Sequence, residues 1–198
     1  DADEIISYTN SQVILEKIID DSSSITELNS QENSVVTIEN AAITLIDEVS
    51  LEITKSINSM TNGKVILQAV KDTFENLIKI DRINSDHVSM DNATVHAIDS
   101  LGLDKVLALR ELTNSKVIID ELSESKTNLI SIISRFDDLV LSRTNINVLD
   151  NVNKFEADTI DSYNDESGLV TLTAITDTVE NVTSVENNTN ISLDTSTI

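Results

Sequence analysis

The chain has 198 residues, of which 39% are hydrophobic and 3% aromatic, and it contains neither proline nor cysteine. Its 35 Asp and Glu outnumber its 13 Lys and Arg, and the formal net charge of −22 opposes binding to nucleic acid and to anionic membrane surfaces. Disulfides and thiolate zinc sites are excluded, and no apolar run approaches the ~20 residues of a membrane-spanning helix. The aliphatic residues suffice for a core, and they suit thin repeated layers better than one globular centre.

Short runs of β-branched residues recur along the chain at nearly constant spacing. In the first set the runs start 52, 52 and 53 residues apart, at Val13, Val65, Val117 and Val170. In the second set they start 52, 51 and 52 residues apart, at Val36, Val88, Leu139 and Ile191. The two sets predict eight strands in about four tandem copies of a 52-residue unit.

An acidic residue follows seven positions after the start of each run in the first set. These residues are Asp20, Asp72, Glu124 and Asp177. Apolar residues three apart come next, beginning with Ile25 and Leu28 in the first copy. The pattern predicts a strand, an acidic N-cap and a short helix with one buried edge.

Apolar–Asp pairs also recur, at Ile46-Asp47, Ile98-Asp99 and Leu149-Asp150. Apolar residues with spacings of eight and three follow each pair, such as Val49, Ile57 and Met60. These spacings are helical, and an Asp carboxylate can accept hydrogen bonds from the N–H groups of a first helical turn. We therefore expect Asp47, Asp99 and Asp150 to be helix N-caps.

The fold class that these patterns predict is α/β, as an elongated β/α solenoid with a parallel sheet on one side and helices on the other. We expect one array over residues 1–198, with two strand–helix half-units in each unit. The expected units are 1–35 (partial), 36–87, 88–138, 139–190 and 191–198, the last being the start of a further unit. Half-units of roughly 21 to 31 residues fall in the range of leucine-rich repeats. A helical bundle is disfavoured by the β-branched runs.

Neither end of the array resembles a polar capping repeat, which solenoids need to cover their open ends. We expect either that the units continue in a longer chain or that subunits stack end to end.

Residues 59–65 (SMTNGKV) and 168–178 (GLVTLTAITDT) resemble the ~50-residue tandem repeats of very large secreted or cell-surface bacterial proteins, notably those of marine cyanobacteria. The resemblance extends over nearly the whole chain. It implies an extracellular location and a role in surface coats, adhesion or motility. Such proteins often carry calcium-binding repeats elsewhere, but this chain lacks their glycine-rich nonapeptide, so that role does not carry over directly.

Carboxylates are the candidate metal ligands, because Ca²⁺ prefers hard oxygen donors. Weak calcium binding between two rows of acids is one hypothesis, and helix capping is the competing one. The rows are Asp20, Asp72, Glu124 and Asp177, and Asp47, Asp99 and Asp150. Further candidates at the turns are Asp81, Asp86 and Asp91, and Asp161, Asp165 and Glu166.

The sequence shows no catalytic or cofactor-binding motif. His87 and His96 have no Asp, Glu or His partner at ligand spacing, and we expect both at ordinary surface positions. Only three glycines exist to build a phosphate-binding loop. We therefore expect no enzymatic activity.

The function expected from these patterns is that of a non-enzymatic extracellular structural protein, part of a surface layer, fibre, filament or adhesin stalk. Its partners would be copies of itself or flanking repeats, with neither nucleic acid binding nor membrane insertion. The alternative is a solenoid module that binds a protein or polysaccharide, although Thr37, Ser89 and Thr171 offer no aromatic platform for sugars. An enzyme of the pectin-cleaving solenoid type ranks third, because no acid/base constellation is visible.

Overall fold

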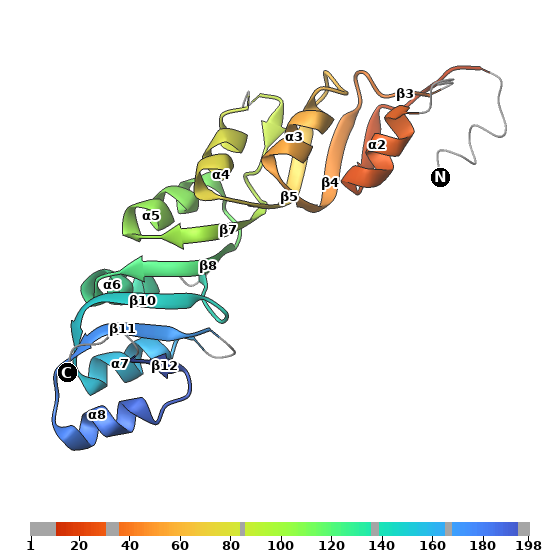
Figure 1. The fold of residues 1–198 in the computed structure, drawn as a ribbon. Helices are drawn as coiled ribbons and strands as arrows, with labels where there is room; N and C mark the ends of the chain where they lie inside the picture. The colour runs from red at the N-terminus through yellow and green to blue at the C-terminus, as the bar shows by residue number, and fades with distance from the viewer. Residues whose placement is uncertain (1–10, 31–35, 84–85, 136–138, 165–167, 194–198) are drawn as a thin grey trace. The chain divides into compact units, whose positions relative to one another are not determined.

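The computed structural model describes residues 11–30, 36–83, 86–135, 139–164 and 168–193 (Figure 1). The chain divides into two compact units, Asp1–Val95 with Leu112–Asn114 and His96–Glu111 with Ser115–Ile198. The described residues form seven α-helices, and neighbouring strands within each unit run parallel. The predicted α/β class with parallel strands is confirmed.

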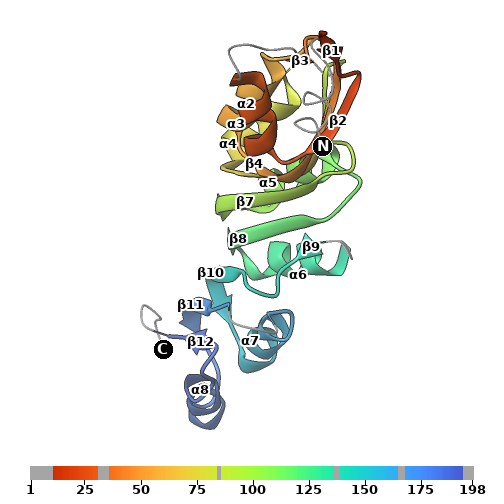
Figure 2. The same cartoon turned by 90° about the vertical axis from the view of Figure 1, so that its right-hand side faces the viewer.

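The first unit alternates strands with helices. Its strands are β1 (Val13–Ile14), β2 (Lys17–Asp20), β3 (Val36–Thr37), β4 (Ala42–Val49), β5 (Val65–Asp72) and β6 (Val88–Ser89). Its helices are α2 (Ser22–Ser30), α3 (Leu51–Asn58) and α4 (Phe74–Asp81). Strand β4 lies between β2 and β5, β6 pairs with β5, and β1 pairs with β3. The three helices lie side by side along one face of these strands (Figures 1 and 2).

The second unit also alternates strands with helices. Its strands are β7 (Thr94–Leu101), whose first two residues belong to the first unit, β8 (Val117–Glu124), β9 (Leu139–Val140), β10 (Asn145–Val152), β11 (Val170–Ile175) and β12 (Ile191–Ser192). Its helices are α5 (Leu103–Leu112), α6 (Lys126–Arg135), α7 (Lys154–Asp161) and α8 (Val179–Glu186). Strand β10 lies between β8 and β11, β9 pairs with β8, and β12 pairs with β11.

All eight predicted strand starts are the first residues of strands. The first set begins β1, β5, β8 and β11, and the second set begins β3, β6, β9 and β12. The strands of the second set are only two residues long. The predicted helices after Asp20, Asp72, Glu124 and Asp177 are also present, as α2, α4, α6 and α8. Ile25, Leu77 and Leu129 are completely or almost completely buried, as the predicted stripe requires.

The prediction that helices start at Asp47, Asp99 and Asp150 is wrong. These residues lie inside the eight-residue strands β4, β7 and β10, which the sequence analysis did not predict. The helices begin further on, at Leu51, Leu103 and Lys154.

A β-bulge explains this error. The pairing of β4 with β5 runs from Ile43 to Leu45 and resumes at Glu48 opposite Ala69, so two residues of β4 oppose one of β5. The same shift separates Val148 from Asn151 in β10. A bulge breaks the two-residue alternation of a strand, and the next buried residue, Val49, then falls at helical spacing from Ile57.

The core lies between the strands and the helices and consists of medium-sized aliphatic side chains. Ile43, Val95 and Ile146 are fully buried in the long strands, and so are Ile57, Leu109 and Ile160 in the helices that follow. The recurring apolar positions in the sequence are therefore core positions of successive layers. We call one strand and the helix that follows it a rung.

Candidate functional site

The acid at the end of β5 accepts hydrogen bonds at the starts of the helices of two neighbouring rungs. Asp72 Oδ2 accepts from the backbone N–H of Leu51, the first residue of α3, at 3.0 Å. Its Oδ1 accepts from the backbone N–H of Thr73 at 2.8 Å and from Asn76 Nδ2 at 2.9 Å, at the start of α4. One carboxylate thus satisfies N–H groups at the starts of two helices, which have no partner within the helices themselves.

The same arrangement recurs in the second unit. Glu124 Oε2 accepts from the N–H of Leu103, the first residue of α5, at 3.1 Å. Asp177 Oδ2 accepts from the N–H of Lys154, the first residue of α7, at 3.0 Å. In both cases the other carboxylate oxygen accepts from the residue that follows the acid, at 2.9 and 2.7 Å.

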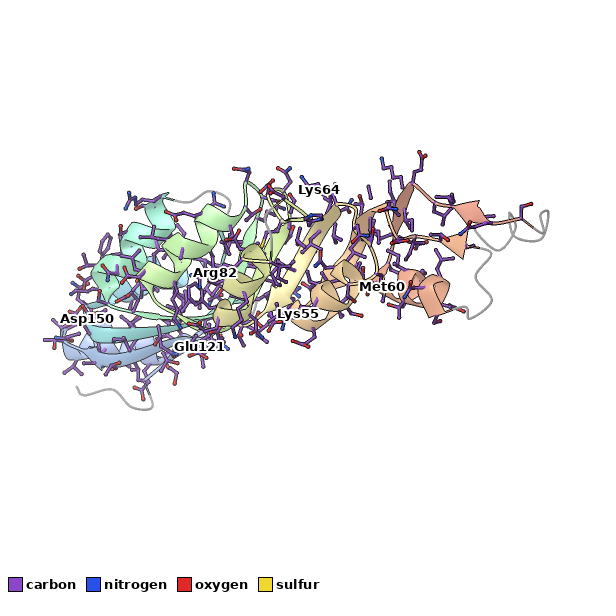
Figure 3. The ribbon with its side chains drawn as sticks, turned by 90° about the horizontal axis from the view of Figure 1, so that it is seen from above. Lys55, Met60, Lys64, Arg82, Glu121 and Asp150 are labelled. Atoms are coloured by element: carbon purple, nitrogen blue, oxygen red, sulfur yellow. The ribbon has the colours of Figure 1, made fainter. Side chains whose placement is uncertain are left out.

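The acids at the bulges cap the helix of the preceding rung. Asp47 Oδ1 accepts from the N–H of Ser22, the first residue of α2, at 2.9 Å. Asp150, labelled in Figure 3, accepts from the N–H of Lys126, the first residue of α6, at 2.7 Å. Asp99 holds the equivalent position in β7. We call Asp47, Asp72, Glu124, Asp150 and Asp177 the strand acids.

Hydrogen bonding lowers the pKa of three strand acids. Burial is the largest single influence on Asp72 and acts to raise its pKa, but the bonds from Leu51, Asn76 and Thr73 together hold it below its usual value. The backbone bond from Ser125 is the main cause of the lowered pKa of Glu124. The backbone bond from Lys154 is the main cause of the lowered pKa of Asp177. These groups are held as carboxylates.

A second set of polar contacts joins rungs at the opposite ends of the strands. The buried Thr61 hydroxyl donates to the carbonyl of Ala41 at 2.7 Å, and the buried Thr113 hydroxyl donates to that of Ala93 at 2.6 Å. Fifty-one residues after Thr113, the side-chain amide of buried Asn164 donates to another buried carbonyl, that of Thr144, at 3.1 Å. These contacts satisfy carbonyl groups that are costly to bury unpaired.

An ion pair links two neighbouring helices of the second unit. Lys126 Nζ lies 2.9 Å from Glu156 Oε2, and both side chains are partly buried. Glu156 also accepts from the backbone N–H of Asn153, in a capping box at the start of α7. The bond from Asn153, followed by the contact with Lys126, lowers the pKa of Glu156.

The structure gives His96 an acidic partner that the sequence analysis did not find. Its Nε2 lies 2.6 Å from Asp120 Oδ1, and the pair lines a hollow together with Arg143 and Ser142. The spacing of 24 residues reflects contact between strands, which a search for local ligand spacing does not detect. His87 is partly exposed, and its backbone carbonyl accepts from Val65.

The carboxylates do not gather into a metal centre in the part of the chain that the structure describes. There, no group of three or more His, Asp or Glu side chains is placed to hold a metal ion. Asp20 accepts from the backbone N–H of Asp21 at 2.9 Å. Two of the turn candidates, Asp165 and Glu166, lie outside the described residues. Calcium binding therefore stays a prediction.

A shallow hollow of about 550 Å³ opens where α7 and α8 begin. Phe155 lines it together with Asn153, Asp158, Thr176 and Asn181. The Phe155 side chain is an exposed aromatic ring, 79% accessible to solvent.

The chain matches no family model, and neither the curated proteins nor the solved structures include a match to it. Among the helices that the structure describes, none is long and apolar enough to cross a membrane.

Proposed function

We propose that the chain is a non-enzymatic structural repeat module in which four 52-residue units stack as a β/α solenoid. In this proposal the module is extracellular and forms part of a surface layer, a fibre or an adhesin stalk. Its partners are copies of the same chain or flanking repeats of a longer one.

The observation that carries the proposal is the use of the recurring acids. Five of them accept backbone hydrogen bonds from the helix start of a neighbouring rung. Each such bond joins the strand end of one rung to the helix start of its neighbour, and so serves the stacking of rungs. A chain whose recurring polar side chains hold layers together fits a structural role better than a catalytic one.

The charge of −22 bears on how copies would assemble. Like charges keep separate molecules apart at low ionic strength, and salt screens that repulsion over a Debye length of ~10 Å at 0.1 M. Association of copies is therefore expected to increase with salt.

The experiment is analytical ultracentrifugation and electron microscopy of the purified chain over a range of protein and salt concentrations. The proposal predicts elongated particles that associate into larger assemblies as salt is raised. Compact monomers at every concentration and ionic strength would contradict it. Labelling of intact source cells with an antibody to the chain tests the extracellular location.

The alternative is a solenoid module that binds a protein or a polysaccharide. One observation favours it, the exposed ring of Phe155 beside polar side chains.

A further inference from the structure

Phe155 has no structural explanation within its own helix. It is the second residue of α7, and its side chain is 79% exposed. The second residues of the corresponding helices α3 and α5 are acids, Glu52 and Asp104. An acid there is favoured by the partial positive charge of a helix N-terminus, whereas an exposed phenyl ring gains nothing from it. The rung of β10 and α7 thus has an apolar surface where the rungs of α3 and α5 have a stabilising acid.

The polar groups around the ring keep hydrogen-bonding capacity. Asn181 donates one side-chain N–H to Asp177, and its carbonyl oxygen can still accept and its second N–H can still donate. Asn153 uses its carbonyl oxygen to accept from Glu156, and its amide N–H groups can still donate. The hydroxyl of Thr176 accepts from Asn151 and can donate in turn. Because their structural bonds hold these side chains in place, little ordering would be required on binding.

The charges in the hollow select among ligands. Asp158 and Asp177 lie in its wall, and the whole chain carries −22, so phosphate, sulfate and uronate groups are repelled. Lys154 also lines the hollow and forms an ion pair with Asp158, so that carboxylate already has a cationic partner. The remaining surface is an apolar ring bordered by neutral amides and a hydroxyl.

We propose that this hollow binds one sugar residue of a neutral polysaccharide. The C–H face of the sugar stacks on the Phe155 ring, where an apolar surface of fixed shape is available at low entropy cost. The sugar hydroxyls bond to Asn153, Thr176 and Asn181. Rung stacking does not require a bound sugar, so this proposal can fail while the proposed structural function stands.

The test is saturation-transfer NMR of the whole chain with four probes. The probes are two neutral oligosaccharides, cellohexaose and hexa-N-acetylchitohexaose, an anionic oligogalacturonate and the cationic peptide hexalysine. We expect transfer to at least one neutral probe, with a Kd on the order of 1 mM as for a single weak contact. The variant Phe155→Glu recreates the residue found in α3 and should weaken binding at least ~10-fold, a loss of ~1.4 kcal/mol.

Two controls separate the site from general effects. Tyr163→Ser removes another exposed aromatic ring, at the end of the same rung, and should leave binding unchanged. In the wild-type chain with labelled phenylalanine, the ring signals of Phe155 should shift on adding sugar while those of Phe74 should not. Equal binding by the wild type and Phe155→Glu, transfer to neither neutral probe, or tighter binding of oligogalacturonate or hexalysine would overturn the proposal.

Discussion

The carboxylate of Asp72 accepts backbone hydrogen bonds from Leu51 and Thr73, at 3.0 and 2.8 Å, and so joins the starts of two successive helices. Glu124 and Asp177 repeat this relationship in the second unit. Since the N–H groups of a first helical turn lack partners within the helix, each acid supplies what two helices need. The stability of one rung therefore depends on a side chain of the next.

Replacing Asp72 with alanine should lower the free energy of unfolding by about 1–2 kcal/mol, because two caps are lost together. Urea denaturation followed by circular dichroism measures the change. Asp86→Ala is the matched control, since Asp86 is an exposed acid at a turn, and a change within about 0.5 kcal/mol is expected there. Equal losses in the two variants would speak against a capping role for Asp72.

The strands of the second set could be predicted from the sequence alone. Val36, Val88 and Ile191 were recognisable because a β-branched run recurs in register with a fixed period, and each begins a strand. The buried edges of α2, α4, α6 and α8 followed from three-residue apolar spacing. In each case the signal is local and repeated.

The bulged strands were missed because their signal is not local. Asp47 and Asp150 follow an apolar residue and precede a helical pattern, as an N-cap does. Only the pairing of β4 with β5 and of β10 with β11 shows that these acids lie within strands. Their capping of α2 and α6, at the preceding rung, depends on tertiary contacts that one sequence does not reveal. The contact of His96 with Asp120 is also a tertiary contact, between residues 24 apart in the sequence, and was missed for the same reason.

Acid should remove the contribution of the caps. The pKa values of Asp72, Glu124 and Asp177 are lowered in the folded chain, so their stabilisation is complete above the ordinary carboxyl values of 3.8 and 4.5. It is lost as the pH falls through the lowered folded values, because the unfolded chain then binds more protons. Relief of repulsion among the other acids acts in the opposite direction.

Comparing variants isolates the caps from that repulsion. The difference in free energy of unfolding between the wild type and Asp72→Asn should be constant from pH 7 to about pH 5 and should shrink below about pH 4. Denaturant titrations at each pH measure it. A difference that persists unchanged in strong acid would mean that the charge of Asp72 does not stabilise the fold.

The buried hydroxyl of Thr61 should contribute about as much to the free energy of unfolding as a helix cap does. Thr61→Val keeps the shape but leaves the carbonyl of Ala41 without its 2.7 Å partner, at a cost of about 1–3 kcal/mol. The matched control is Thr159→Val, whose hydroxyl bonds within its own exposed helical turn. Unfolding midpoints in urea should fall for Thr61→Val and change little for Thr159→Val. The reverse order would show that the Thr61 contact is dispensable.

Gly63 should not tolerate a side chain. A Cβ atom there would lie 2.2 Å from the carbonyl oxygen of Ala41, so the backbone of one rung would be pushed from the next. Gly63→Ala is expected to cost about 1–3 kcal/mol, as overpacking does. At Gly102 the nearest atom is the flexible Glu124 carboxylate at 3.1 Å, and Gly102→Ala should cost less. Thermal unfolding of both variants checks the order, and equal midpoints would count against close contact at Gly63.

The most direct measurement is the pH titration of the backbone amide signals of Leu51 and Thr73 by NMR. If one carboxylate holds both helix starts, the two amides should titrate together with a midpoint below 3.8, and Asp72→Asn should abolish that step in both. An amide signal of Leu51 that neither titrates with Thr73 nor responds to Asp72→Asn would contradict the coupling of one rung to the next.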